Sequence, residues 1–195
     1  MMFSYAWRGS KGSGKRTALI EFLKRIAQQI PINGTFTISN GTWIMNKNGS
    51  SITRGTDNNG DNRSSTAEDN QGAGGDDDDE LEGKRIPYEY SQIHLGFDVA
   101  RMSMSDKIFL NSILQRWTGQ DDVTLINTVL PTRYLVLYHA HLLSDESILQ
   151  IQETLEKYNN FGVLMTTELP ICNRLSDHVL EIPVAGRDLL FEDIS

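Results

Sequence analysis

Gly9-Ser10-Lys11-Gly12-Ser13-Gly14-Lys15-Arg16-Thr17 is the stretch that decides how the rest of the chain is interpreted. It follows a short apolar run, Met2 to Trp7, and precedes an amphipathic pattern that begins at about Arg16. A strand, a glycine-rich loop with a lysine, and a helix in this order are what a phosphate-binding P-loop requires. Glycines let backbone N–H groups turn toward an anion, and the helix adds the partial positive charge of its N-terminus. The stretch therefore predicts a site for nucleotide phosphates.

Nine residues are the predicted contacts with the nucleotide, ATP or ADP. They are Gly9, Ser10, Lys11, Gly12, Ser13, Gly14, Lys15, Arg16 and Thr17. Lys15 would contact the outer phosphates as a point charge. Arg16 departs from the pattern G-x-x-x-x-G-K-[ST], because it stands where a hydroxyl group should hold Mg²⁺, and Thr17 comes one residue late. The stretch thus supports nucleotide binding more strongly than Mg²⁺ binding, and an ordinary glycine- and serine-rich loop is the alternative.

The composition is that of a single folded unit with a polar segment in its middle. The chain has 195 residues and a formal net charge of −8, and the run Asp76 to Glu80 contributes much of that charge. The remainder is mildly acidic, so the sequence predicts no broad basic surface and no autonomous tight binding to nucleic acid. Cys172 is the single cysteine, which excludes an intrachain disulfide and favours a reducing compartment. Without an apolar leader or a run of about 20 apolar residues, we expect an intracellular protein, nuclear or cytoplasmic, that is neither secreted nor bound to a membrane.

Three regions follow from the pattern. Residues 1–53 contain the P-loop and its helix, and residues 85–195 contain the remaining strands and helices. Residues 54–84 carry Gly, Asn, Asp and Ser with almost no large apolar side chain. Such a segment cannot bury enough surface to offset its ordering entropy, so it is predicted to be a disordered insertion.

Periodicity predicts alternating strands and helices. Strands are expected at 2–7, 35–38, 42–45, 86–90, 93–97, 133–138, 161–165 and 179–182, with a hairpin turn at 46–49 and a connecting turn around Leu175. Helices are expected at 17–30, from Ser105 to about Gly119, and from Ser144 to Tyr158. Strands that alternate with helices after a P-loop indicate an α/β fold, in which helices cover both faces of a parallel sheet in three layers. Ligands of such sheets lie at the carboxyl ends of the strands, where the glycine loop is expected.

The second half of an ATPase site is altered. A P-loop ATPase usually has another apolar strand that ends in an Asp for Mg²⁺ and a Glu for the attacking water. Here the strand residues 135–137 are followed by Tyr138, His139, Ala140 and His141. Imidazole is a poor ligand for Mg²⁺, which prefers oxygen. Inefficient hydrolysis is therefore expected, and a transition-metal site at His139 and His141 is a weaker alternative because a third ligand is lacking.

These features together resemble the AAA+ clamp-loader ATPases, specifically the small subunits of replication factor C. Gly14-Lys15-Arg16-Thr17 is similar to a family variant whose P-loop reads glycine-lysine-lysine-threonine. The stretch from Tyr138 to Tyr158 is similar to the family's second-strand region, most specifically at Leu155-Glu156-Lys157-Tyr158. Residues 93–98 resemble another family strand. The resemblance implies an AAA+ core, ATP or ADP as ligand, other clamp-loader subunits and a sliding clamp as partners, and DNA bound only as part of a complex.

The departures from the family pattern bear on activity. The family's two catalytic carboxylates fall on His141 and His139, and its sensor Asn falls near Thr166 or Thr167. Its arginine-finger motif falls near Asp177-His178-Val179, with Arg174 close but misplaced. The lid and collar helices of the family have no counterpart before Ser195. We therefore expect a clamp-loader-like module of DNA replication that binds nucleotide without hydrolysing it efficiently. The alternatives are an active ATPase that uses other carboxylates (Asp98, Asp145 or Glu146) and a small P-loop nucleoside or nucleotide kinase.

Overall fold

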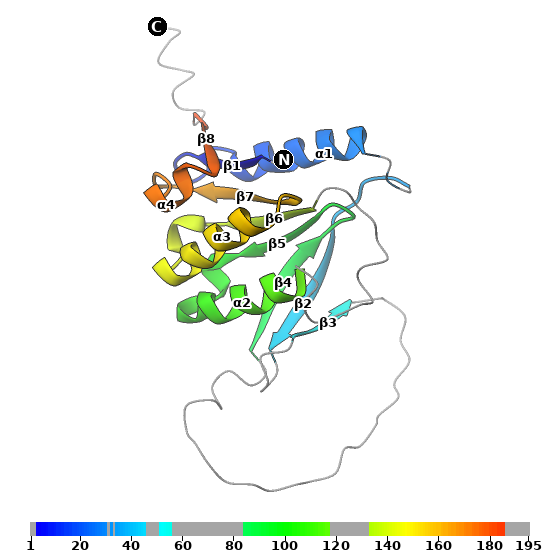
Figure 1. The fold of residues 1–195 in the computed structure, drawn as a ribbon. Coiled ribbons are helices and arrows are strands. Elements are labelled where there is room, and N and C mark those ends of the chain that lie inside the picture. The colour runs from blue at the N-terminus through cyan, green and yellow to red at the C-terminus, as the bar shows by residue number, and fades with distance from the viewer. Residues whose placement is uncertain are drawn as a thin grey trace, which may run out of the picture.

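The computed structural model describes residues 3–30, 32, 34–45, 51–55, 84–117 and 133–185, and for 45, 51–55, 103, 116, 117 and 133 it describes the backbone alone. Eight strands form one sheet in the order β3-β2-β4-β5-β6-β7-β1-β8 (Figure 1). The strands are β1 (Ser4–Arg8), β2 (Ser39–Met45), β3 (Ser51–Gly55), β4 (Arg85–Tyr90), β5 (His94–Asp98), β6 (Arg133–Tyr138), β7 (Phe161–Thr167) and β8 (Val179–Pro183). The helices are α1 (Lys15–Gln29), α2 (Asp106–Trp117), α3 (Asp145–Lys157) and the short α4 (Asn173–Ser176).

Five of the strands run parallel. β5, β6, β7, β1 and β8 pair with one another in parallel. β4 pairs antiparallel with β5, β2 with β4, and β3 with β2. The sheet therefore has a parallel core and an antiparallel extension, which differs from the wholly parallel sheet that alternating strands and helices predict. Three consecutive strands, β2, β3 and β4, are joined without an intervening described helix, so nothing forces them into parallel crossovers.

Helices cover both faces of this sheet and make three layers. α1 packs on one face, where Leu19, Leu23 and Ala27 join Trp7, Tyr134 and other strand residues in one core. The opposite face carries α2, α3 and α4, whose apolar side chains join strand residues such as Leu135 and Leu137 in a second core. Residues 134–138 alternate between these two cores, which explains why β6 is a continuous apolar run after Arg133. The expected three-layer α/β fold is confirmed.

Most of the expected elements are present, with three differences. Residues 35–38 form no strand, and Leu175 lies in α4 rather than in a turn. β3 is a strand that the sequence pattern missed, and it includes Arg54 and Gly55, which were assigned to the insertion. The expected turn at 46–49 and the residues 56–83 lie outside the described part of the chain. Within the described residues, none of the helices combines the length and apolarity that crossing a bilayer requires.

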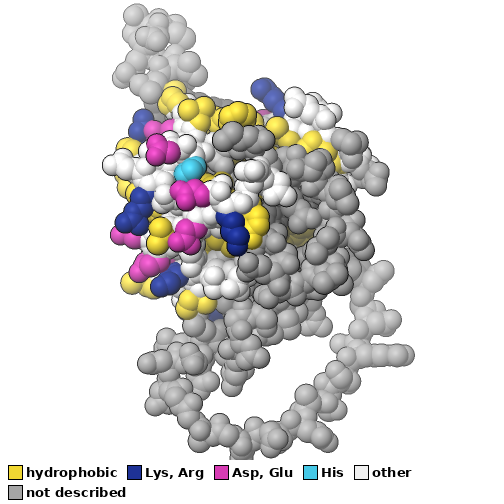
Figure 2. Space-filling view, in the orientation of Figure 1, with side chains coloured by type: hydrophobic (Ala, Val, Ile, Leu, Met, Phe, Trp, Pro, Cys, Tyr) yellow, Lys and Arg dark blue, Asp and Glu magenta, His cyan; other side chains and the backbone are white. Residues whose placement is uncertain are grey.

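Surface charge on the helical face is mixed. Over α2, α3 and α4, acidic and basic side chains are interspersed rather than segregated (Figure 2). This arrangement agrees with the mildly acidic composition, and it gives this face no basic patch of the kind that nucleic-acid binding requires.

Candidate functional site: the glycine loop and the ends of the parallel strands

The glycine loop joins the carboxyl end of β1 to the first turn of α1. β1 lies between β7 and β8, and two backbone bonds hold the start of the loop: Gly9 N donates to Thr167 O (3.1 Å) and Val184 N donates to Arg8 O (2.7 Å). A Cβ on Gly9 would lie 2.5 Å from Ser13 Oγ and 2.6 Å from Val184 O, so a side chain at this position would clash with its neighbours. The nine predicted residues therefore lie together on one loop and helix start.

Two glycines shape the loop. Gly12 and Gly14 have φ angles of 78° and 89°, in the left-handed region that favours glycine. Gly14 is the residue that precedes α1, and Ala18 N donates to its carbonyl at 3.0 Å. Because Gly14 has no side chain, no side-chain hydrogen bond caps the helix. The first N–H groups of α1 are thus left for an anion, which is the usual ligand of such a helix end.

The first turn of α1 is unusual in its charge. Helices favour acidic residues at the N-terminus, yet α1 has none in its first turn and begins with Lys15 and Arg16. The Lys15 ammonium donates to Gly9 O at 2.8 Å and to Ser10 O at 2.6 Å, so it lies across the loop. Two cations at a positive helix end repel each other and the helix dipole. An anionic ligand between them would remove this repulsion.

Arg16 points toward the sheet and meets two side chains there. Its Nη2 lies 2.8 Å from Glu89 Oε2, and its guanidinium carbon lies 4.6 Å from the centre of the Tyr138 ring. Tyr138 is the last residue of β6, so Arg16 occupies the space between the glycine loop and the end of that strand. In a P-loop ATPase this space holds Mg²⁺ between the helix hydroxyl and the strand carboxylate. Thr17, the displaced hydroxyl, is exposed on α1.

Glu89 is a buried carboxylate that the sequence pattern did not single out. It lies on β4 opposite Gly96 of β5, and its residue is 6% exposed. Both of its oxygens are engaged, since Oε2 meets Arg16 and Oε1 accepts a hydrogen bond from the Tyr138 hydroxyl. Burial opposes ionisation of Glu89, but His94, Tyr138 and Arg16 outweigh it and hold the pKa of the Glu89 carboxyl below its usual range. Glu89 is therefore an anion that fixes the position of the Arg16 guanidinium.

His94 and Tyr138 complete the surroundings of Glu89. The His94 side chain is fully buried, with Nε2 3.5 Å from Glu89 Oε1 and Nδ1 2.5 Å from Ser91 Oγ. Burial and the adjacent carboxylate raise the pKa of the Tyr138 phenol far above its usual range, so Tyr138 remains a hydrogen-bond donor. The sequence carries no clear signal for this cluster, because alternation with apolar residues predicts a solvent-facing Glu89, and the glycine opposite it is known only from the strand pairing.

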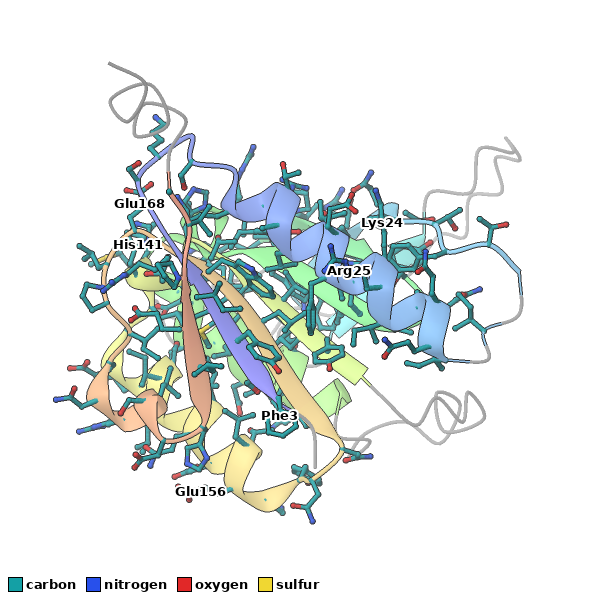
Figure 3. The ribbon with its side chains drawn as sticks, turned by 90° about the horizontal axis from the view of Figure 1, so that it is seen from above. Phe3, Lys24, Arg25, His141, Glu156 and Glu168 are labelled. Atoms are coloured by element: carbon teal, nitrogen blue, oxygen red, sulfur yellow. The ribbon has the colours of Figure 1, made fainter. Side chains whose placement is uncertain are left out.

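The two histidines lie at the carboxyl end of β6, where the family carboxylates were expected. His139 has a φ of 56°, its N–H donates to Thr166 Oγ1 (3.1 Å), and its Nδ1 lies 2.8 Å from Asp98 Oδ1. His141 Nδ1 accepts from the Glu168 N–H at 3.3 Å, and Figure 3 shows His141 and Glu168 together at this end of the sheet. The two imidazole rings are 6.0 Å apart. Among the described residues no three His, Cys, Asp or Glu side chains form a group that could hold a metal.

The other family positions serve local contacts. Thr167 Oγ1 donates to Leu169 O at 2.7 Å, at the end of β7. His178 Nε2 lies 3.3 Å from Glu156 Oε1 of α3, and Arg174 is exposed on α4. Thr166 Oγ1 accepts from the His139 backbone N–H, so the position expected for the sensor contacts one of the two histidines.

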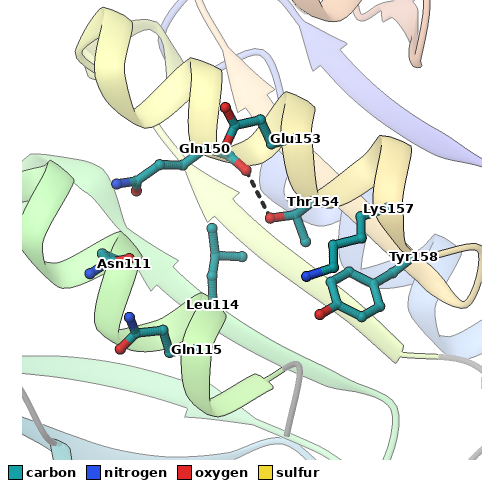
Figure 4. Close-up of a pocket in the computed structure, with 8 residues that line it drawn as sticks. All are labelled: Asn111, Leu114, Gln115, Gln150, Glu153, Thr154, Lys157 and Tyr158. Atoms are coloured by element: carbon teal, nitrogen blue, oxygen red, sulfur yellow. Dashed lines mark hydrogen bonds between the residues drawn. The ribbon is translucent and has the colours of Figure 1, made fainter. Parts of the chain in front are cut away.

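A small cavity opens beside this cluster. It has a volume of about 160 Å³ and is lined by Arg16, Glu89, Asp98, Arg101 and Tyr138, together with residues of β2, β4 and β5. Two guanidinium groups and two carboxylates thus face the same space. A second cavity, between α2 and α3, lies on the other face of the sheet and is lined by Asn111, Leu114, Gln115, Gln150, Glu153, Thr154, Lys157 and Tyr158 (Figure 4). Since α1 and the glycine loop pack on the opposite face, this second cavity is no part of the loop site.

Comparisons with known proteins add little to this geometry. No family model matches the chain, and no curated protein matches it either. Among solved structures, a chain from the structure of C. elegans PCH-2 is similar over 48% of this chain and 26% of that chain, with 15% identity and a TM-score of 0.33. The aligned part is about a quarter of that protein's chain, and a TM-score this low does not support an argument about family or function.

Proposed function

We propose that this chain is a nucleotide-binding P-loop module of the AAA+ type that hydrolyses ATP poorly. The observation that carries the proposal is the glycine loop itself, with Gly12 and Gly14 in left-handed conformations, an uncapped helix behind them, and Lys15 across the opening. The loop follows a strand in the parallel core of the sheet. Backbone N–H groups, the helix dipole and a lysine together are the chemistry that binds polyphosphate.

The expectation of poor hydrolysis rests on Arg16 and on the residues that follow β6. Arg16 replaces a metal-binding hydroxyl, and His139 and His141 follow β6 where carboxylates would position Mg²⁺ and water. The His139 imidazole lies against Asp98 at the end of β5, and the His139 backbone N–H donates to Thr166 Oγ1 of β7. Residues 139–141 therefore provide no pair of carboxylates that would hold Mg²⁺ and orient an attacking water molecule.

Calorimetric titration with ATP and ADP tests nucleotide binding. Wild-type protein should bind both nucleotides, and Lys15→Ala should weaken binding at least tenfold through loss of a charge-assisted contact. Lys24→Ala is the matched control, because Lys24 is an exposed lysine of α1 that is not among the predicted nucleotide contacts, and it should change the affinity by less than threefold. Absence of binding by wild-type protein would contradict the proposal.

An ATPase assay tests poor hydrolysis. Turnover should not rise above that of the Lys15→Ala variant. Steady turnover that Lys15→Ala abolishes would instead establish an active ATPase, with Asp98 as the carboxylate nearest to His139.

The resemblance to replication factor C small subunits extends the proposal to partners. The module would act through contact with other clamp-loader subunits and a sliding clamp, with DNA bound by the assembly as a whole. Co-purification with tagged clamp and clamp-loader subunits tests this part, and failure to associate with any of them would refute it without affecting nucleotide binding.

A further inference from the structure

The space between α1 and the end of β6 is built for a cationic side chain and not for a metal ion. Mg²⁺ prefers oxygen ligands in octahedral geometry. On the cavity, both oxygens of Glu89 and one oxygen of Asp98 are already engaged. Glu89 uses Oε1 for Tyr138 and Oε2 for Arg16, and Asp98 Oδ1 accepts from Ala100 N (3.0 Å) and lies 2.8 Å from His139 Nδ1. The donor set therefore does not fit Mg²⁺.

The Arg16 guanidinium is held where the missing metal charge would be. Its contact with Glu89 is made by Nη2, and its face lies over the Tyr138 ring. A guanidinium carries five N–H donors in a plane, so donors beyond Nη2 can meet a second anion. The Arg16 side chain is 64% exposed while that of Glu89 is 7% exposed, so the buried carboxylate holds the guanidinium on one side and leaves the other side open to solvent.

We propose that Arg16 supplies the positive charge that a divalent cation would otherwise bring to the nucleotide phosphates, with Glu89 and Tyr138 as its positioning residues. The chain then binds ATP and ADP in their metal-free forms. This inference rests on the proposed nucleotide binding. Its physical basis is that planar guanidinium pairs well with phosphate oxygens, and that Mg²⁺ bound to the phosphates would compete with Arg16 for them.

Affinities measured in Mg²⁺ and in EDTA test the inference. For wild-type protein, the Kd for ATP in excess EDTA should equal the Kd in 5 mM Mg²⁺ within about twofold, or be lower. Arg16→Ser should raise the Kd in EDTA by about tenfold, since it removes one charge-assisted pair, while its thermal midpoint shows that it is folded. Arg25→Ser is the matched control, because Arg25 is also exposed on α1 but lies away from the loop (Figure 3), and its Kd should not change.

Two further variants separate positioning from folding. Glu89→Gln keeps an oxygen acceptor but removes the charge that anchors Arg16, so it should raise the Kd in EDTA by about threefold to fivefold. Arg16→Lys keeps the charge and should recover part of the affinity that Arg16→Ser loses. A structural effect alone would lower stability without changing the ratio of the affinities in EDTA and Mg²⁺.

The possible binding results distinguish failure of this inference from failure of the proposed nucleotide binding. If wild-type protein binds ATP at least tenfold more tightly with Mg²⁺, the inference is wrong while the proposed nucleotide binding stands. If it binds in EDTA and Arg16→Ser binds equally well, Arg16 has no such role. If it binds in neither condition, the proposed function fails, and the inference fails with it.

Discussion

The side chain of Glu89 passes directly over Gly96, its antiparallel partner on β5, to reach Tyr138 on β6. A Cβ on Gly96 would lie 2.7 Å from Glu89 Cγ and 2.9 Å from Glu89 Oε1. The contact between the antiparallel extension and the parallel core therefore depends on the absence of a side chain at one position. It joins β4 to β6 across the strand that lies between them.

Gly96→Ala tests this dependence. The added methyl group cannot fit beside the Glu89 carboxylate, so Glu89 must move away from Tyr138, and we expect a loss of about 1–3 kcal/mol in the free energy of unfolding. Urea denaturation followed by fluorescence measures the loss. The Glu89→Ala background supplies the control, because the clash is absent there. In that background Gly96→Ala should cost much less, and equal costs in both backgrounds would show that Glu89 is not what fills the space.

Tyr138→Phe removes the hydroxyl that donates to Glu89 Oε1. The buried carboxylate then loses a hydrogen bond, so the free energy of unfolding should fall by about 1–3 kcal/mol. Tyr158→Phe serves as a comparison at a half-buried tyrosine outside this cluster, and it should stay within about 0.5 kcal/mol of wild type. Thermal unfolding by circular dichroism is sufficient to separate the two variants.

Acid should destabilise the protein through Glu89. Its pKa is lower in the folded protein than in the unfolded chain, so the unfolded chain binds the proton more readily. The stabilisation is fully present above the unfolded value of about 4.3 and is lost as the pH falls toward the folded value. Stability measured from pH 6 downward should decline, and Glu89→Gln should decline less steeply. An unchanged slope in that variant would assign the acid sensitivity to other groups, Asp106 among them.

Asp106 makes a second junction, between α2 and α3. Its Oδ2 accepts from Ser144 N at 2.8 Å and from Ser147 Oγ at 2.7 Å, so one carboxylate holds the start of α3. Burial opposes ionisation of Asp106, but these bonds keep the pKa of its carboxyl below the usual range. Asp106→Ala should lower the free energy of unfolding by about 2 kcal/mol, because Ser147 is left buried without its acceptor.

The neighbouring Lys107→Ala provides the control for Asp106→Ala. Lys107 is exposed on α2, and its removal should change the free energy of unfolding by no more than about 0.5 kcal/mol. Chemical denaturation of both variants measures this difference in the free energy of unfolding. Equal midpoints would contradict a structural role for the junction.

The parallel core could be predicted from the sequence because its signals are local. The helix from Lys15 follows an apolar repeat, and the start of α3 at Ser144 follows a capping pattern, in which the Ser144 side chain accepts from Ser147 N. β6 and β7 are apolar at nearly every position because helices bury both of their faces. Each of these patterns is complete within fewer than twenty residues.

The antiparallel extension and the Glu89 cluster could not be predicted in the same way. The direction in which β2 and β4 pair depends on their neighbours in the sheet, not on their own composition. Glu89, Arg16 and Tyr138 are far apart in the sequence and meet because β4, β5 and β6 lie side by side. The glycine loop predicted the location of the site, but the partner of Arg16 emerged only from the pairing of Glu89 with Gly96.

The left-handed backbone at His139 affects whether a catalytic carboxylate could be introduced at this position. A left-handed conformation at a residue other than glycine costs about 1 kcal/mol, and here bonds to Thr166 and Asp98 maintain it. An aspartate or glutamate at position 139 would place a second negative charge beside the Asp98 carboxylate, where His139 Nδ1 now lies 2.8 Å from Oδ1, and the two like charges would repel each other. A carboxylate introduced at position 139 would therefore need a compensating exchange at position 98.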